Sequence, residues 1–490
     1  MLIALLVIPF ASALASWFIP ADWPRRILLL LTSATTLVLV AICWVVQPAP
    51  AIGGLLILDA MGRLVLTTTS VLFFAASVYA VGYLRGEDTG TRKDFQQGLH
   101  FSNAPEATFT ACLLLFLTCA VLVAITRHFG LLWVGIETTT IVSAPLIYFH
   151  RHQRSLEATW KYLLICSVGI ALALIGNLLL DISMQSEGML TSNMTLNALL
   201  VNASAVHPTW FKAAFVFLLI GYGTKMGVAP MHTWLPDAHS EAPSLVSALL
   251  SGALLNCAFL GIFRAYEVSI AAGLEEFSST LLLAFGFFSM LTAALFIVQL
   301  GDFKRMLAYS SVEHMGILLI ALGVGLEATR GGMLHMVGHS LVKASLFMLA
   351  GNILAKYSTK SSHDVTGLMR ILPVTGVLWL AGIIAITGSP PFSIFISEFS
   401  ILQGILHRGH AWLGLLYLVL LGVIFVGMVT PVLRMCKGRP PHGIVAQKRE
   451  NPLLVVPSAC LLLLALILGI ALPEWFSNAL NLAAAMGLRP

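Results

Sequence analysis

Several ionisable side chains stand in stretches of this sequence that are otherwise apolar, at spacings that suit proton transfer. His335, His339 and Lys343 recur every four residues in "LHMVGHSLVKASLF". On an α-helix this spacing puts them on one face, about 6 Å apart along the axis, so one water would bridge each gap. A neutral imidazole accepts a proton at one nitrogen and releases one from the other. The stretch predicts a proton relay, with a metal chelate or packing histidines as the alternatives.

Lys225 is the most informative single residue. It follows "FLLIGYGT" deep inside an apolar segment and directly precedes "MGVAPM". Burial favours the neutral amine of a lysine, whereas a nearby carboxylate favours the ammonium form. Glu137, in "LLWVGIETTT", is the available carboxylate. We expect changes in this pair to make Lys225 hold or release its proton; a lysine that extends its charge to the membrane surface is the alternative.

Other ionisable residues in apolar segments extend this set. A charge at the bilayer centre costs roughly 2.5–3.5 kcal/mol, so such residues are candidates for function. The predicted proton pathway comprises Glu137, Lys225, His232, His239, His335, His339, Lys343 and Glu398. Glu313 and His314 are a candidate inlet, or alternatively cap their segment against a neighbour. We predict no metal site.

Three further charged residues are expected to be structural. Lys161 follows Glu157 by four residues, which predicts an ion pair on a helix surface. Asp237 and Glu241 follow Pro236 and are expected to cap the start of the next helix.

The composition places these residues in a membrane. The 490-residue chain is 58% hydrophobic and 10% charged, whereas a soluble protein has about 25% charged residues. The net charge of +5 comes from basic residues spread through short loops, which argues against a nucleic-acid binder. The seven cysteines include no Cys-x-x-Cys, so we predict no iron–sulfur, zinc-ribbon or thioredoxin-type site.

A membrane-spanning helix needs about 20 mostly apolar residues, and this rule predicts about fourteen spans. With both termini outside, 17 Lys and Arg fall in the inner loops and 7 on the outer side, as the positive-inside rule requires. The predicted spans lie near 2–19, 26–46, 63–84, 106–126, 129–149, 157–181, 209–231, 243–267, 277–300, 306–326, 331–356, 372–404, 411–435 and 453–474.

Two of these spans carry helix breakers at matching places. "MGVAPM" and "TGSPPF" each have a glycine followed three residues later by a proline, Gly227 with Pro230 and Gly388 with Pro391. Proline removes a backbone donor, and free carbonyls are tolerated in a membrane only beside protein or water. Paired breaks indicate an inverted repeat with an ion path at its centre.

The predicted fold is therefore an all-α membrane protein with two inverted five-helix repeats, each containing a broken helix. Its parts are an N-terminal three-helix segment, a first repeat of spans 4–8, a second repeat of spans 9–13, and a last span with an interfacial tail. Their expected boundaries are 1–104, 105–267, 277–436 and 453–490.

The motifs together carry a family resemblance. "GVAPMHTWLPDAHSEAPSLVSALLS", "LLWVGIE", "LAYSSVEHMG" and "HMVGHSLVKASLF" resemble the antiporter-like membrane subunits of respiratory complex I, multisubunit sodium/proton antiporters and group 4 membrane-bound hydrogenases. The resemblance covers nearly the whole chain. Within that superfamily, "HSEAPS", "LLNCA" and the chain length are most similar to the branch that contains the F component of hydrogenase-4.

The resemblance implies a hydrated polar axis and assigns residues to it. Glu137 and Lys225 match the glutamate of span 5 and the lysine of span 7, and Glu398 matches the charged residue of broken span 12. His335 and His339 match the span-11 histidine region. Complex I relatives place a lysine or histidine in span 8, where this chain has Asn256. Asparagine orients water but carries no proton, so transfer to His335 would depend more on water, or pumping would be weak.

We expect a proton-translocating, non-redox subunit of an energy-converting complex, with both termini outside the bacterial cytoplasmic membrane. The resemblance implies partner membrane subunits, and a nickel–iron centre, iron–sulfur clusters or quinone in those partners rather than in this chain. The alternatives are a cation/proton antiporter and a structural subunit that does not conduct.

Overall fold

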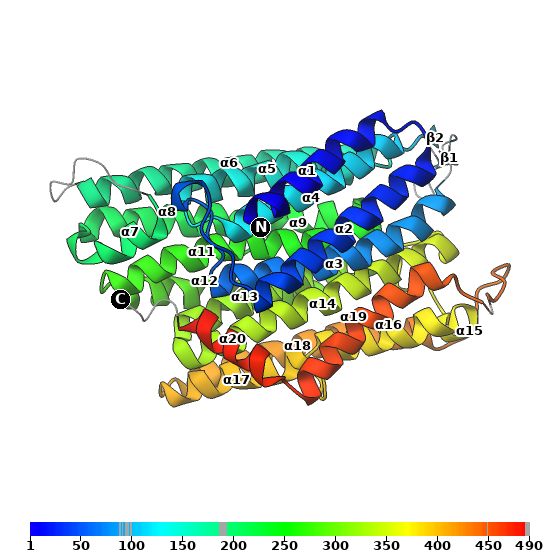
Figure 1. Ribbon diagram of the computed structural model, residues 1–490. Helices are drawn as coiled ribbons and strands as arrows, with labels where there is room; N and C mark the ends of the chain where they lie inside the picture. Colours follow the sequence, from blue (N-terminus) through cyan, green and yellow to red (C-terminus); the bar gives the residue numbers. More distant parts are fainter. Residues whose placement is uncertain are drawn as a thin grey trace.

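The computed structural model describes residues 1–87, 90, 92–93, 98, 100–185, 194–447 and 449–485. Within these ranges nearly every regular element is a helix, and long helices lie side by side in one bundle (Figure 1). The elements up to the first interruption are α1 (Leu2–Phe18), α2 (Asp22–Val45), η1 (Ile52–Gly54), α3 (Ala60–Gly86), β1 (Arg92–Lys93), β2 (His100–Phe101), α4 (Glu106–Ile125), α5 (Phe129–Ile147), α6 (Gln153–Gln185), α7 (Leu196–Val201), η2 (Ala203–Ala205) and α8 (Pro208–Met226).

The second part of the chain continues the bundle. Its elements are η3 (Met231–Thr233), α9 (Trp234–Glu241), α10 (Ser244–Leu249), η4 (Leu250–Leu254), α11 (Leu255–Ala271), α12 (Glu275–Ile297), α13 (Phe303–Val324), α14 (Leu326–Tyr357), α15 (Leu368–Ile371), α16 (Pro373–Ile386), α17 (Ser393–His407), α18 (Ala411–Cys436), α19 (Pro452–Ile470) and α20 (Glu474–Ala484). β1 and β2 form a two-residue antiparallel ladder.

The prediction of an all-α membrane protein is confirmed. Within the described residues, 12 helices are long and apolar enough to cross a membrane, counting α8 to α9 and α10 to α11 as one each. Three apolar helices are shorter, namely α1, α16 and α17. Each predicted span has a helix at its place.

α14 lies at the centre of the bundle. Its apolar length is entirely buried, and it packs against α3, α10, α13, α16, α17 and α19. Because α14 is covered by other helices on every side, the ionisable side chains that it carries are enclosed by protein rather than by lipid.

The first predicted interruption is confirmed and is longer than expected. α8 ends at Met226, and Gly227 takes the left-handed conformation at φ +79°, which glycine adopts without steric cost. The chain re-enters a helix at Trp234, whose indole nitrogen donates to the Thr224 carbonyl over 2.8 Å. That bond satisfies one of the carbonyls freed by the break.

The segment after this break corrects one prediction. Asp237 and Glu241 were expected to cap the next helix, but both lie inside α9, a half-helix buried against α6 and α13. α10 instead starts after Pro243, which makes no side-chain cap. The sequence of this stretch is too polar to predict a buried helix. The helix is buried nonetheless, because its charged residues pair with residues from neighbouring segments.

The second predicted interruption is also confirmed. α16 ends at Ile386, Gly388 has φ +66°, and α17 starts at Ser393. Both Pro230 and Pro391 follow cis peptide bonds.

One feature of this bundle lies outside the predictions, and a second belongs to the predicted tail. α10 passes into α11 through a π-helical turn, η4, close to Asn256. The C-terminal α20 packs against α3 and α14 and runs in a different direction from the long helices (Figure 1). The end of the predicted tail, 486–490, lies outside the described residues.

Candidate functional site

The first group of candidate residues surrounds Lys225 at the end of α8. Its ammonium donates to the hydroxyls of Thr140 and Tyr162, the latter over 2.7 Å, and its side chain is fully buried. Tyr162 is 2.7 Å from the hydroxyl of Ser143. α5 supplies Thr140 and α6 supplies Tyr162, so three helices converge on one lysine beside the break.

Glu137 joins this group indirectly. Its carboxylate lies 3.4 Å from the Thr140 hydroxyl, which also contacts Lys225. Within the described residues, Glu137 and Lys225 make no direct ion pair, so the predicted pair acts across Thr140. Glu137 is only half-buried, which puts its carboxylate near the lateral surface of the bundle.

Asn256 and His239 make up the middle of the candidate site and have unused hydrogen-bonding atoms within the described part of the chain. Asn256 donates from Nδ2 to the Gly252 carbonyl and to the Ser340 hydroxyl, both over 2.8 Å. Its Oδ1 is buried and has no hydrogen-bond partner among the described residues. His239 stacks on Phe347 with ring centroids 4.8 Å apart. Both side chains are fully buried, and a water beside them would find open donors and acceptors.

The second group contains three histidines rather than two. The His314 ring lies 5.0 Å from both the His335 ring and the His339 ring. His314 Nδ1 and His335 Nε2 are 2.9 Å apart. His314 was predicted as an inlet residue, yet it lies at the centre of the histidine cluster, because α13 packs directly against α14.

Ser397 lies within hydrogen-bond distance of both the Ile394 carbonyl, at 2.7 Å, and His335 Nδ1, at 2.8 Å. If its hydroxyl donates to the carbonyl, the serine oxygen accepts from His335 Nδ1. His335 then carries its proton on Nδ1 and presents a lone pair at Nε2 toward His314. One proton on His314 Nδ1 completes the contact, which is the arrangement that a relay requires.

Glu398 closes the row on α17. Its carboxylate is buried, and Oε1 has no hydrogen-bond partner in the described part of the chain. One ligand atom each from His314, His335 and Glu398 lie within 4.8 Å of one another. The fold thus supplies a carboxylate beside the histidines, a donor set that admits a metal ion as well as protons.

Lys343 and Glu313 form the remaining buried charges of the second group. Lys343 donates to the Leu307 carbonyl, and Glu313 is the carboxylate within electrostatic range of it. The three residues of the predicted relay face on α14 therefore all face α13, His335 and His339 through His314 and Lys343 through the Leu307 carbonyl. His232 lies apart from this row, with its ring 5.7 Å from that of Tyr309.

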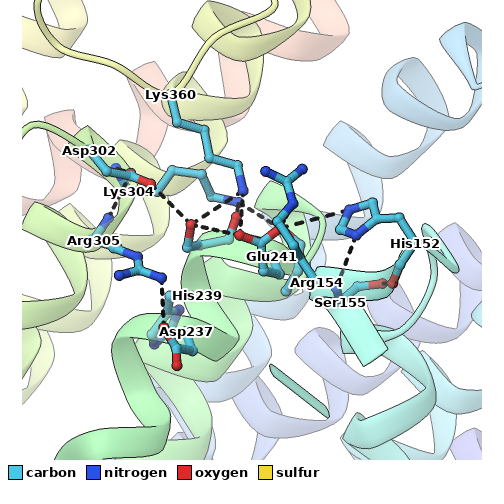
Figure 2. Close-up of polar contacts among 12 residues, drawn as sticks. His152, Arg154, Ser155, Asp237, His239, Glu241, Asp302, Lys304, Arg305 and Lys360 are labelled. Carbon is cyan, nitrogen blue, oxygen red and sulfur yellow. Dashed lines mark hydrogen bonds and ion pairs between the residues drawn. The ribbon is translucent and has the colours of Figure 1, made fainter. Parts of the chain in front are cut away.

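A separate charged cluster surrounds Glu241 at the end of α9 (Figure 2). Lys360 contacts its carboxylate at 2.8 Å, and His152 and Arg154 approach the other oxygen at 3.8 and 3.9 Å. Lys304 donates to the Ala242 carbonyl over 2.7 Å and so binds the C-terminal end of α9, where a cation is favoured. A cavity of about 390 Å³ adjoins the cluster.

Neighbouring bonds extend this cluster to the surface of α9. Asp237 bonds Arg305 over 2.8 Å and Lys161 over 3.0 Å. Lys161 also contacts Glu157 at 2.7 Å, so the predicted surface pair is confirmed. α9 is therefore held by charges from α6, α13 and the loop after α14.

A third polar group lies between the N-terminal end of α3 and the C-terminal half of α11. Arg264 donates to Asp59 over 2.8 Å, and Arg127 approaches the same oxygen at 3.3 Å. Asp59 also caps α3, accepting from the Gly62 amide over 2.7 Å. Sequence reasoning missed this group because Asp59 and Arg264 are 205 residues apart.

The long apolar helices, the two interruptions and the buried ionisable side chains define a multi-pass helical membrane protein with polar groups in its interior. The sequence profile of the family described as NADH:quinone oxidoreductase/Mrp antiporter, transmembrane, matches residues 127–424. The chain belongs to that family.

Relatives of known name agree with this assignment. The chain is 37% identical over 367 residues to a hydrogenase-4 component F homolog of Methylacidiphilum infernorum, covering 72% of this chain and 74% of the relative. It is 28% identical over 356 residues to hydrogenase-4 component B of Escherichia coli, covering 70% of this chain but 49% of that longer protein.

Solved structures share the fold. A chain of the membrane-bound sulfane sulfur reductase, an archaeal respiratory membrane complex, superposes with a TM-score of 0.86 at 21% identity, covering 100% of this chain and 98% of the other. A chain of the Mrp complex from Dietzia sp. gives 0.84 at 20% identity, covering 99% and 96%.

Proposed function

We propose that this chain is the proton-translocating membrane subunit of an energy-converting redox complex, of the hydrogenase-4/formate hydrogenlyase or NADH:quinone oxidoreductase type. Family membership and the relatives named as hydrogenase-4 components support this proposal. The observation that carries it is the placement of two buried ionisable groups, one beside each interrupted helix.

The proposed path runs from Glu137 and Lys225 toward Glu398. Lys225 releases its proton when Glu137 is drawn away or neutralised, because the buried ammonium then loses the carboxylate nearest to it in the described part of the chain. His239 and water held at Asn256 carry the proton to the second group. His339, His314 and His335 then pass it to Glu398. Moving one charge against the membrane potential costs about 2.3 kcal/mol per 100 mV, which the redox step must supply.

We also propose the membrane arrangement. Fourteen spans would form if α1 and the joined α16 and α17 cross the bilayer with the 12 longer helices. The matching glycine–proline breaks support two inverted repeats, at 105–267 and 277–436, with the flanking segments 1–104 and 453–490 outside them. The distribution of Lys and Arg supports both termini outside a bacterial cytoplasmic membrane.

Partners would supply the electron transfer. Other membrane-arm subunits would bind the lateral faces, and a nickel–iron centre, iron–sulfur clusters or quinone would belong to those partners. The multi-subunit membrane complexes among the structural neighbours support this assembly. Glu137, half-buried near one lateral surface, is the member of the row most accessible to a neighbouring subunit.

The test is proton uptake by the purified complex in sealed vesicles, with Lys225→Ala and Glu137→Gln. We expect redox turnover to continue or slow while proton uptake per electron falls at least tenfold in both variants. Lys161→Ala, which removes a lysine from the exposed surface of α6, is the matched control and should stay coupled. Unchanged proton uptake per electron in both test variants would favour a structural subunit that does not conduct. The neutral Asn256 in the middle of the row is compatible with that alternative.

A cation/proton antiporter is the second candidate, because the family description includes the Mrp antiporter. Uptake of ²²Na⁺ against a proton gradient, without any redox substrate, would distinguish it. Exchange that is abolished by Lys225→Ala would support the antiporter, and its absence beside redox-driven proton uptake would support the redox subunit.

A further inference from the structure

We propose that Gly388, at the second helix interruption, is a positioning residue for Glu398. The space that a side chain at residue 388 would fill is occupied by the Glu398 carboxylate. The consequence for proton transfer rests on the proposed function, whereas the placement of the carboxylate does not.

Gly388 and the carboxylate of Glu398 are in close contact. A Cβ built on Gly388 would lie 1.9 Å from Glu398 Oε2 and 2.8 Å from its Cδ. Both distances are far inside van der Waals contact, so the carboxylate rests directly on the glycine backbone. Glycine is thus required here for space as well as for φ +66°.

The backbone of the interruption is restrained by α19 on one side. α19 packs against the Pro391–Ser393 end of the interruption through Gly469, where an added Cβ would overlap the Pro391 carbonyl oxygen. A side chain at residue 388 would therefore move the flexible carboxylate rather than the backbone. The fold would survive, but the separation between Glu398 and the His314–His335 pair would change.

The first interruption shows that this contact is not a general requirement of the turn. A Cβ on Gly227 would meet Leu235 Cδ1 at 2.3 Å, a methyl group that carries no proton. The two interruptions share a glycine with positive φ, yet only the second holds an ionisable group against it. The same backbone turn therefore serves packing in one case and placement of a carboxylate in the other.

The test uses infrared difference spectroscopy on the full complex. The carboxyl band of Glu398 is first assigned as the band lost in Glu398→Gln. We expect Gly388→Ala to shift that band and to lower proton uptake at least tenfold, in a complex that assembles normally. Gly409→Ala is the control, because Gly409 has φ +78° with open space around it and so tests backbone strain alone. An unshifted band in Gly388→Ala would overturn the inference.

A double-variant cycle separates positioning from general damage. Glu398→Asp shortens the side chain, so its carboxylate no longer reaches Gly388. In that background we expect Gly388→Ala to add no further loss of uptake, whereas two independent defects would multiply. Multiplied losses would overturn the inference. A shifted band in a complex whose uptake never depended on Glu398 would uphold the placement and refute the proposed function.

Discussion

The hydroxyl of Thr140 lies between Glu137 and Lys225, accepting from the lysine and standing 3.4 Å from the carboxylate. The two ionisable side chains of the first group are therefore joined by hydrogen bonds through a neutral side chain. A threonine whose hydroxyl faces both partners can pass a change at one to the other without a direct ion pair.

Thr140→Val removes this hydroxyl with little change in volume. We expect proton uptake per electron to fall about tenfold, equivalent to ~1.4 kcal/mol, because Lys225 loses one of its two side-chain acceptors. Thr138→Val is the control, since Thr138 is on the same helix and bonds only the Val134 carbonyl at an exposed position. Equal uptake in the two variants would contradict the bridging role.

Asn256 tests whether the middle of the row depends on a polar side chain. Asn256→Leu removes the bond to Ser340 and the open Oδ1, and we expect uptake to fall about tenfold, or ~1.4 kcal/mol. Asn256→His supplies a titratable group and should equal or exceed the unaltered chain. Both are measured as initial rates of vesicle acidification. Unchanged proton uptake in Asn256→Leu would show that the proton path does not pass Asn256.

Asp59 and Arg264 should contribute strongly to stability. Asp59→Asn keeps the cap on α3 but leaves Arg264 buried without its carboxylate, and losing one partner of a buried pair costs about 3–5 kcal/mol. Lys161→Ala breaks two surface pairs, with Glu157 and Asp237, and should cost about 1 kcal/mol or less. Denaturant titration in detergent micelles compares the two, and similar costs would refute the contrast.

His128 should make the start of α5 sensitive to pH. Its Nδ1 accepts from the amides of Gly130 and Leu131, and burial lowers the pKa of its ring. Because the folded pKa lies below the unfolded value of about 6.5, the cap stabilises fully above that pH and is lost as pH falls through the folded pKa.

The measurement for this cap is thermal unfolding between pH 7.5 and about 5. We expect His128→Asn, which retains a capping oxygen, to show a smaller loss of melting temperature over this range than the unaltered chain. Parallel pH profiles would show that the ring does not act as the cap.

The sequence predicted the fold where the physical signal was local. Apolar length located the spans, and glycine–proline spacing located both interruptions at Gly227 and Gly388, because each depends on neighbouring residues alone. The half-helix from Trp234 to Glu241 was missed, since its charges are neutralised by Lys360, Arg305 and Lys161 from distant segments.

The candidate site was predicted by charge but not by its neutral members. Lys225, His335, His339 and Glu398 are conspicuous in apolar segments. Thr140, Tyr162, Ser340 and Ser397 are ordinary residues of membrane helices, and only the packing of α5, α6, α14 and α17 brings them to the ionisable groups. The position of His314 among the histidines likewise depends on how α13 meets α14.

α14 carries His335, His339 and Lys343 and is enclosed by protein along its whole apolar length. Sliding or tilting such a helix would open voids against several neighbours at once. We therefore expect α14 to keep its place during the proposed proton transfer, so that only imidazole rings, hydroxyl groups and water molecules reorient. We expect a signal from a partner subunit to reach these histidines as a change in electric field, because displacing α14 would cost packing free energy against several helices.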